Sequence, residues 1–405
     1  MKAVKWMALG LAAAMMTGIL GACSEPAGAS GDAGEGAIKI GSIHPITGAY
    51  AYEAQAIVNA QKLAVDEINA AGGIQSLGGR KLELVVGDSQ GNADTGTSEA
   101  QRLINEGVVA LTGTFQSSVT QTATQEAEKE GVPFLVTISN NVAMFERGFR
   151  YSFRIQPNAD VFAQNFLDDI AQVKTDDIKT AVLLNEDSIT GTDSGDIIEQ
   201  NFGQTGIELL DRITYSASTT TLSTEVTRLA ELKPDLLITI GYFADTSLLV
   251  KEINERGLKF KLVCGVANGG ISDTKVIEDF DGSVENYMDL NYRFNPKSDQ
   301  TETLLSDYKE AYGSDMSVHA VFGYESIKVL ADALERAAST DHDKLRDALA
   351  ATDYAGHTLA QGGGIKFDEK GENVNAAGVL VQIQDGKQVV VYPKAFAEAD
   401  IRINQ

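Results

Sequence analysis

Positive charge and cysteine are both scarce in this chain of 405 residues. Its 33 lysine and arginine residues stand against 57 aspartate and glutamate residues, and the net charge is −24. Nucleic-acid binding needs a basic surface that displaces phosphate counterions, so this balance argues against a nucleic-acid partner. The 2 cysteines exclude a disulfide-stapled miniature, and a hydrophobic share of 43% excludes a disordered chain. The length suits about two to three domains, each with its own core.

Histidine and phosphate-binding motifs are also sparse. The 4 histidines are scattered, with no pair at the spacing of a zinc site, and no phosphate-binding loop ending in Gly-Lys-Ser or Gly-Lys-Thr occurs. These histidines are His44, His319, His342 and His357. We therefore expect no metal or cofactor, and a binding protein is favoured over an enzyme.

One polar segment follows the spacing of a calcium loop. The residues at its ligand positions are Asp88, Gln90, Asn92, Asp94 and Glu99. Position three of the loop is a glutamine, however, and Ala93 stands where the calcium loop requires glycine. Asp88 also lies where a predicted strand gives way to a helix, and aspartate and asparagine commonly cap helices there. Helix capping is the interpretation we favour.

The N-terminus has the pattern of a secretory signal. Lys2 and Lys5 precede an apolar run from Trp6 to Leu20, which is too short to span a membrane. The tetrapeptide Leu-Gly-Ala-Cys that ends at Cys23 resembles the lipobox of bacterial lipoproteins, in which the cysteine is acylated.

This pattern predicts a lipoprotein signal peptide at 1–22, lipid attachment at Cys23 and a flexible tether at 23–36. The anchor would hold the protein to the membrane of a bacterial cell envelope, on the periplasmic or extracytoplasmic face. The alternative is ordinary cleavage near Ala22, which leaves a soluble protein.

From Ile38 onward, short apolar runs alternate with longer segments of helical period. The first series of predicted strands is Ile38–Ile43, Leu82–Gly87, Val108–Thr112 and Phe134–Thr137. The helices between them include Tyr52–Ala71, which ends at a glycine pair, and Ser117–Glu130, which opens on a Ser118-x-x-Gln121 capping signal.

The alternation restarts near Thr180. The second series of strands is Ala181–Leu184, Ile207–Ile213, Leu236–Ile240 and Lys261–Cys264. The helices predicted between them are Gly195–Phe202, Ser223–Leu232 and Thr246–Glu255. Strands that alternate with helices imply parallel sheets covered on both faces, so two consecutive series imply two α/β lobes.

Two loops of the first series are rich in neutral hydrogen-bonding groups. In open α/β sheets, ligands bind beyond the carboxyl ends of the strands, where loops meet helix N-termini. The loop 113–118 ends in Ser117 and Ser118, and the loop 137–141 contains Ser139 and Asn140. Together with exposed helix N–H groups, such side chains suit a carboxylate or another polar head. Helix capping is the equal alternative at this stage.

Tyrosines follow two of the predicted strands. Tyr50 and Tyr52 come after the first strand, and Tyr242 comes after the strand that ends at Ile240. They are candidates for the walls of a cleft, although isolated tyrosines more often serve packing.

The segments 38–41 (Ile-Lys-Ile-Gly), 45–48 (Pro-Ile-Thr-Gly) and above all 63–74 (Leu-Ala-Val-Asp-Glu-Ile-Asn-Ala-Ala-Gly-Gly-Ile) resemble the branched-chain amino-acid-binding proteins of ABC importers. The segments 79–84 and 130–134 continue the resemblance, which extends over about residues 37–405. It implies the type I periplasmic binding protein fold, an α/β fold of two doubly wound lobes joined by three hinge crossings.

The implied lobes are lobe 1 at 37–156 and 289–374 and lobe 2 at 157–288 and 375–405. The implied function is that of a monomeric extracytoplasmic solute-binding protein. It would capture a small polar ligand (an amino acid, an amide or a small carboxylate) between its lobes and deliver it to the membrane permease of an ABC importer. The alternative is a ligand-sensing receptor lipoprotein that presents its closed state to a signalling partner.

The resemblance also implies ligand-binding residues. A carboxylate-binding hydroxyl corresponds to Ser117, and the next loop contributes Ser139 and Asn140. An aromatic residue of the second lobe corresponds to Tyr242, and a tyrosine of the first loop corresponds to Tyr50 or Tyr52.

Two positions depart from this family. A Tyr-Gly pair after the first strand of lobe 2 is replaced by Thr190-Gly191. The loop 265–270, where the family places a carboxylate opposite the ligand ammonium, contains no acid. A buried ammonium without a counter-charge is costly. Either Asp187 or Asp245 therefore takes this role, or the ligand lacks an α-ammonium group.

Overall fold

The computed structural model describes residues 36–404 except 268, 269, 272 and 281. The predicted signal peptide, the predicted lipid site at Cys23 and all but the last residue of the predicted tether lie outside this part of the chain. Among the described residues, none of the helices combines the length and the apolar character that crossing a membrane requires.

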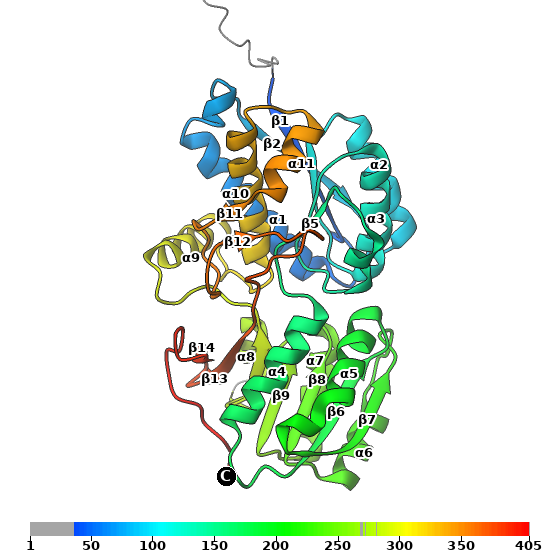
Figure 1. The fold of residues 1–405 in the computed structure, drawn as a ribbon. Coiled ribbons are helices and arrows are strands. Elements are labelled where there is room, and N and C mark those ends of the chain that lie inside the picture. The colour runs from blue at the N-terminus through cyan, green and yellow to red at the C-terminus, as the bar shows by residue number, and fades with distance from the viewer. Residues whose placement is uncertain (1–35, 268–269, 272, 281, 405) are drawn as a thin grey trace, which may run out of the picture. The chain divides into compact units, whose positions relative to one another are not determined.

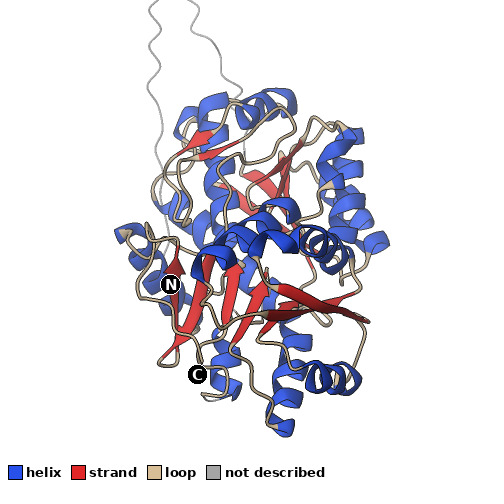
Figure 2. Ribbon diagram, turned by 60° about the horizontal axis from the view of Figure 1, so that its bottom comes forward, coloured by secondary structure: helices blue, strands red, loops and turns tan. Residues whose placement is uncertain are grey.

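The described chain is built on two main β-sheets that are covered by helices (Figures 1 and 2). The first sheet is parallel throughout and has the order β2-β1-β3-β4-β5. Its strands are β1 (Ile38–His44), β2 (Leu82–Asp88), β3 (Ala110–Gly113), β4 (Phe134–Val136) and β5 (Ser152–Arg154). This sheet forms the first lobe.

The second sheet has the order β14-β13-β10-β9-β8-β6-β7 and forms the second lobe. Its strands are β6 (Thr180–Glu186), β7 (Glu208–Tyr215), β8 (Leu236–Ile240), β9 (Leu262–Val266), β10 (Met288–Asn291), β13 (Val379–Gln384) and β14 (Lys387–Tyr392). Strands β6 to β10 are parallel, whereas β13 pairs antiparallel with both β10 and β14.

Helices pack on both sheets. Those of the first lobe are α1 (Ala51–Ala70), α2 (Ala93–Asn105), α3 (Ser117–Glu130), α9 (Asp299–Tyr312), α10 (Ala320–Ala337) and α11 (His342–Ala350). Those of the second lobe are α4 (Ala159–Val173), α5 (Ile189–Asn201), α6 (Ser223–Leu232), α7 (Phe243–Arg256) and α8 (Thr274–Phe280). Short elements complete the described chain: η1 (Gln75–Leu77), η2 (Ala143–Arg147), η3 (Phe202–Thr205), β11 (Asp353–Tyr354) and β12 (Ile365–Lys366).

The chain passes between the two lobes three times. It does so between β5 and α4, between β10 and α9, and between β12 and β13. The boundary predicted before residue 289 falls inside β10, which pairs with β9 and β13 of the second sheet. The second crossing therefore follows Asn291, because backbone pairing of an apolar strand keeps Met288–Asn291 in the second lobe.

Local predictions were most accurate where the apolar pattern is clean. The strand Leu236–Ile240 and the helix Ser223–Leu232 have the predicted bounds. Helix α5 begins at Ile189, six positions before the predicted Gly195, because polar residues in its first two turns obscure the apolar period.

Two predicted helix starts had different outcomes. Asn92 caps α2, since its side-chain oxygen accepts a hydrogen bond from the Thr95 N–H at 3.0 Å, so the capping interpretation of this segment is confirmed. The capping role of Ser118 was wrong. Helix α3 has Gln116 at its N-cap, and the Gln116 carbonyl accepts the Thr120 N–H at 3.0 Å.

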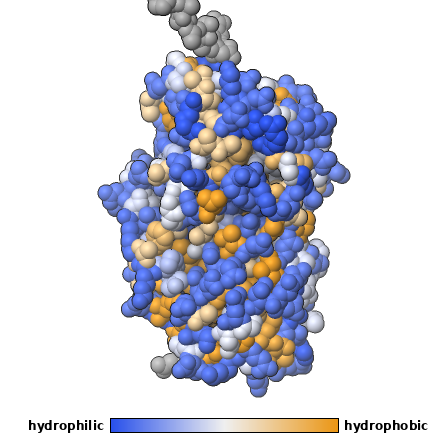
Figure 3. Space-filling model, in the orientation of Figure 1, coloured by the Kyte–Doolittle hydropathy of each residue, from blue (hydrophilic) through white to orange (hydrophobic). Residues whose placement is uncertain are grey.

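The cores follow from the parallel sheets. All five residues of β8 are buried, as expected for a strand covered on both faces. The face drawn in Figure 3 is mostly hydrophilic, with apolar residues in small separate areas. Among the described residues, the exposed large hydrophobic side chains are Tyr52 and Ile189, in the first turns of α1 and α5, and Val374, between β12 and β13.

Candidate ligand-binding site

A cavity of about 340 Å³ lies between the two lobes, beyond the carboxyl ends of strands from both sheets. Its lining residues are Tyr50, Gly91, Gln116, Ser117, Ser118, Asp187, Ser188, Ile189, Thr190 and Tyr242. Both lobes thus contribute the loops that parallel α/β sheets offer to ligands. A larger hollow of about 580 Å³ is lined by residues 145–153, 346–350 and 367–371, away from these strand ends.

Two buried serines meet at the N-terminus of α3. The Ser139 hydroxyl, which follows β4, donates to the Ser117 Oγ at 2.9 Å. The Ser117 Oγ also lies 3.4 Å from the Thr190 Oγ1 of the second lobe. The first N–H groups of a helix lack intrahelical acceptors and carry its partial positive charge. This part of the cavity therefore combines hydroxyl and amide donors with a positive helix end.

Three buried amide atoms near these serines lack hydrogen-bond partners among the described residues. They are Nε2 and Oε1 of Gln116 and Oδ1 of Asn140. Gln116 lines the cavity, and its side chain packs against Gly91, where an added Cβ would lie 2.6 Å from Nε2. Buried polar groups are almost always satisfied, so the Gln116 amide beside the cavity is available to hydrogen-bond a ligand. Gln116 was not among the predicted site residues.

Tyr50 and Tyr242 form an aromatic wall of the cavity, and the buried Phe115 packs against both rings. The centroid of Tyr50 lies 5.3 Å from that of Tyr242 and 5.8 Å from that of Phe115, and the Phe115 and Tyr242 centroids are 5.9 Å apart. The Thr190 and Ser188 hydroxyls hydrogen-bond the Tyr242 side chain, while burial raises the pKa values of Tyr50 and Tyr242. Both phenols therefore remain neutral, and the wall offers aromatic faces without charge.

Tyr52 does not line the cavity. It is the second residue of α1, is 48% exposed, and donates from its hydroxyl to the Asp273 Oδ1 at 3.2 Å. Its ring centroid lies 5.5 Å from that of Phe243. Tyr52 thus makes a contact between the lobes, whereas Tyr50, just before α1, faces the cavity.

Asp187 and Asp245, the two acids predicted as possible partners of a ligand ammonium, both accept hydrogen bonds from the second lobe. Asp187 lines the cavity, but it is exposed and accepts the Ala217 N–H at 2.8 Å. Asp245 accepts the Tyr215 hydroxyl at 2.7 Å and the Tyr242 N–H at 3.2 Å.

Glu186 is fully buried, and it accepts hydrogen bonds from the Ser188 hydroxyl and, at 3.0 Å, from the Gly191 N–H. Burial raises the pKa values of Asp245 and Glu186. In the loop 265–270, Asn268 and Gly269 lie outside the described residues.

Glu53 is a buried acid between the lobes that the sequence patterns did not single out. It lies in the first turn of α1, is 4% exposed, and accepts a hydrogen bond from the Phe243 N–H at the start of α7. Burial raises its pKa to about 7, and the nearby charges of Asp273 and Asp245 act in the same direction. A carboxylate of one lobe thus sits on a helix N-terminus of the other.

The segment 87–91 (Gly-Asp-Ser-Gln-Gly), which spans the end of β2 and the turn before α2, has the Gly-x-Ser-x-Gly pattern of a nucleophile elbow. Ser89 is fully buried, however. The nearest histidine in the chain, His44, has both ring nitrogens buried without a hydrogen-bond partner among the described residues, and burial lowers its pKa to about 3. This serine therefore lacks the paired base that an activated nucleophile requires.

Two α/β lobes joined by three crossings, with a cavity at the loops between them, define the class of two-lobed solute-binding proteins. The sequence profile of the family described as periplasmic binding protein matches residues 37–388. The chain therefore belongs to this family, and the predicted fold class and family are confirmed. By its family it is an extracytoplasmic protein that binds a small-molecule solute.

Individual relatives agree with this assignment. The Leu/Ile/Val-binding protein homolog 7 of Brucella suis biovar 1 (strain 1330) is 32% identical over 383 residues, which cover 91% of this chain and 94% of that protein. The leucine-binding protein LivK from Thermotoga maritima MSB8 shares the fold with a TM-score of 0.77 at 20% identity, covering 88% of this chain and 98% of its own. A solute-binding protein from R. palustris in complex with benzoate has a TM-score of 0.78 at 20% identity, and the match covers 90% of this chain and 98% of that protein.

Gly191→Ala is expected to displace the first turn of α5 and thereby to lower ligand affinity about tenfold. A Cβ at this residue would lie 2.2 Å from the Glu186 carbonyl oxygen and 2.7 Å from its Oε1, so the first turn of α5 must shift together with Ser188 and Thr190. Isothermal titration calorimetry measures the change. Gly203→Ala is the control, because a Cβ there meets nothing within 4 Å. Native affinity in Gly191→Ala would exclude the first turn of α5 from the site.

Proposed function

We propose that this protein captures a small carboxylate that has an apolar, preferably aromatic, body and no α-ammonium group. The observation that carries the proposal is the Ser117–Ser139 hydroxyl pair at the N-terminus of α3: Ser117 lines the cavity, and Asp187, the one acid among the described lining residues, accepts a hydrogen bond from its own lobe. The closed protein would then deliver this ligand to the permease of an ABC importer.

The carboxylate would be bound by neutral donors. Ser117 and Ser139 are both buried, and the helix end behind them favours negative charge without a basic side chain. Ser118 and the unpaired Gln116 amide supply further groups on the same side of the cavity. Asn140, also buried with an unpaired side-chain oxygen, completes this group of proposed binding residues.

The hydrogen bonds that already engage the acids beside the cavity argue against an amino acid. Asp187 and Asp245 were the acids predicted to replace the missing carboxylate of loop 265–270, and both accept hydrogen bonds within the second lobe. An ammonium group buried here would lose its hydration without a paired charge, which costs several kcal/mol even after relaxation (order of magnitude).

The body of the ligand would lie against the rings of Tyr50 and Tyr242, which line the cavity and suit a flat apolar group. Proteins of this fold bind both chemistries, since the solved structures include complexes with leucine and isoleucine and with benzoate and 3,4-dihydroxybenzoic acid. The neutral hydrogen-bond donors of this cavity, and the acids that are already hydrogen-bonded, support a ligand of the benzoate kind.

We also propose that acylated Cys23 anchors the protein to the membrane, that it acts as a monomer and that it catalyses no reaction. The described structure supports the reading of Cys23 as a lipid site rather than a disulfide partner, because Cys264 is a buried free thiol. Burial raises the pKa of Cys264 well above its usual value, so this thiol is unreactive.

Matched ligand pairs test the proposed function by calorimetry. Leucine against 4-methylpentanoate and phenylalanine against 3-phenylpropanoate differ mainly by the ammonium group, and benzoate against benzamide differs by the charge of the head. We expect each ammonium-free carboxylate to bind more tightly than its partner. Ser117→Ala should weaken benzoate binding about tenfold through a lost hydrogen bond to a charged group.

A preference for leucine over 4-methylpentanoate would refute the ligand class while leaving solute binding intact. No binding across all six compounds would count against the proposal as a whole. If Ser117→Ala binds benzoate with native affinity, Ser117 does not contact the carboxylate.

A further inference from the structure

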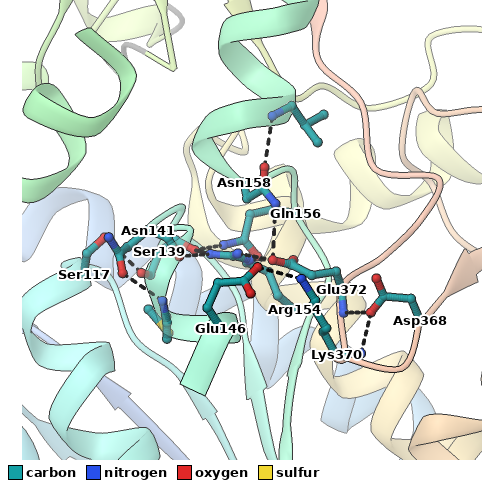
Figure 4. A network of polar contacts seen from close by, with 12 residues as sticks. Ser117, Ser139, Asn141, Glu146, Arg154, Gln156, Asn158, Asp368, Lys370 and Glu372 are labelled. Atoms are coloured by element: carbon teal, nitrogen blue, oxygen red, sulfur yellow. Dashed lines mark hydrogen bonds and ion pairs between the residues drawn. The ribbon is translucent and has the colours of Figure 1, made fainter. Parts of the chain in front are cut away.

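Arg154, the last residue of β5, is a fully buried arginine beside the proposed carboxylate-binding loop (Figure 4). Its Nη1 donates to the carbonyl oxygens of Ser139 at 3.1 Å and Asn141 at 2.8 Å. Its guanidinium also lies 4.4 Å from the ring centroid of Phe145. One buried side chain therefore holds the backbone of the loop that carries Ser139 and Asn140.

The other side of the guanidinium forms a two-pronged ion pair with Glu372. Arg154 Nε donates to Glu372 Oε2 at 2.8 Å, and Nη2 donates to Oε1. Glu372 lies on the segment between β12 and β13, which is the third crossing between the lobes. Asp368 holds this segment by accepting the Glu372 N–H at 2.9 Å.

Glu372 also reaches the first crossing. Its Oε1 accepts a hydrogen bond from Asn158 Nδ2 at 3.2 Å, and the Asn158 side-chain oxygen caps α4 by accepting the Val161 N–H at 3.0 Å. The Asn140 carbonyl in turn accepts the Ala159 N–H at 2.8 Å, so the binding loop and the start of the second lobe's first helix are hydrogen-bonded directly.

Gln156, also on the first crossing, donates from its side-chain amide to the Ser139 carbonyl. Ser139 then donates to Ser117, the residue that opens α3. Figure 4 shows this continuous series of contacts from Ser117 through Arg154 to Glu372. It joins the serine pair to two of the three crossings between the lobes.

We propose that Arg154 is a positioning residue for ligand binding: its ion pair with Glu372 fixes the 139–141 loop and couples that loop to the first and third crossings. The ligand contacts of the loop rest on the proposed function, whereas the coupling does not. Because a guanidinium presents several N–H donors in one plane, Arg154 satisfies two carbonyls and one carboxylate at once, which a lysine ammonium cannot reproduce in this geometry.

Hydrogen–deuterium exchange without ligand tests the coupling. Glu372→Gln and Arg154→Lys should both increase amide exchange in the 139–141 loop and at the start of α4, far along the chain from residue 372. Lys370→Met is the matched control, because Lys370 belongs to the same segment but forms an exposed ion pair with Glu146 at 2.7 Å. Faster exchange confined to residues near 372 in Glu372→Gln would overturn the proposal.

Ligand affinity separates positioning from a merely structural role. Both single variants should bind their ligand at least tenfold more weakly, with benzoate and leucine as the two probes. The double variant Arg154→Met, Glu372→Met removes both charges and can recover thermal stability. It should nevertheless bind its ligand at least tenfold more weakly than the native protein, because no side chain replaces the hydrogen bonds of Arg154 to the 139–141 loop.

Recovery of native affinity together with stability in the double variant would show that Arg154 only stabilises the fold. If the native protein binds leucine and not benzoate, the proposed ligand class is wrong. The affinities of the native protein and its Arg154 and Glu372 variants are then compared with leucine. If it binds neither, the solute-binding proposal fails for these probes, and the exchange experiment decides the coupling.

Discussion

Replacing Tyr242 by alanine is expected to lower ligand affinity about 100-fold, equivalent to about 3 kcal/mol. Tyr242 lies at the N-cap of α7 in the second lobe, and its ring packs against Tyr50 and Phe115 of the first. The ring therefore contributes a wall of the cavity and a contact that forms only when the lobes meet. Calorimetry with benzoate measures the loss.

Two control variants separate the ring from its hydroxyl and from tyrosine truncation in general. Tyr242→Phe keeps the wall and loses only the hydrogen bonds with Thr190 and Ser188, so its affinity should fall less than tenfold. Tyr312→Ala removes a tyrosine from α9, where it packs on Tyr308, and should leave affinity unchanged. Affinity in Tyr242→Ala within threefold of the native value would remove this ring from the site.

Much of the fold was predictable because parallel sheets impose a strong pattern on the chain. Strands buried on both faces read as continuous apolar runs, as in β8, and helices between them show an amphipathic period. The pattern failed where apolar residues are sparse. Helix α2 has three buried residues in thirteen, and the prediction of a helix after Asp88 gave it no bounds.

The serine loops of the site were predictable for the same reason, since strand ends at one edge of a sheet converge. The choice between Tyr50 and Tyr52 was not, because it depends on where α1 begins. Tyr50 is the N-cap, outside the helix, whereas Tyr52 lies within its first turn and points to another surface. A shift of two residues in the start of this helix would place Tyr52 where Tyr50 stands.

Interactions between distant segments left no trace in local sequence. Arg154 and Glu372 are separated by 218 positions, and each is surrounded by residues that suit an exposed strand or turn. Glu53 looks like an ordinary acid in the first turn of a helix until the second lobe covers it. Such contacts depend on how the three crossings bring the lobes together, which no periodicity records.

A second buried acid lies in the first lobe, away from the ligand. Glu325 of α10 is fully buried, and its Oε1 accepts the Thr358 N–H at 2.7 Å and the Thr358 hydroxyl at 2.6 Å. Its Oε2 has no hydrogen-bond partner among the described residues. Burial raises its pKa to about 7 despite the hydrogen bonds from Thr358. The folded protein therefore holds this proton more tightly than the unfolded chain does.

The sign of the resulting pH dependence follows from that difference. Below the ordinary pKa of glutamate the acid is neutral in both states, and the folded state carries no penalty. As pH rises through the folded-state pKa of about 7, the charge must be buried, and stability falls. A pKa raised by about 2.5 units corresponds to a loss of about 3 kcal/mol once the acid is ionised in both states.

Glu325→Gln should therefore flatten the decline in stability between pH 5 and pH 8. We expect the variant to gain about 2–3 kcal/mol relative to the native protein over this interval, because a neutral amide keeps the acceptor for Thr358 and carries no charge. Urea unfolding at both pH values measures the gap. Glu310→Gln, at an exposed position of α9, is the control and should leave the gap unchanged. If the difference in unfolding free energy between Glu325→Gln and the native protein is the same at pH 5 and pH 8, Glu325 ionises in the folded protein without penalty, through solvent access or a compensating charge.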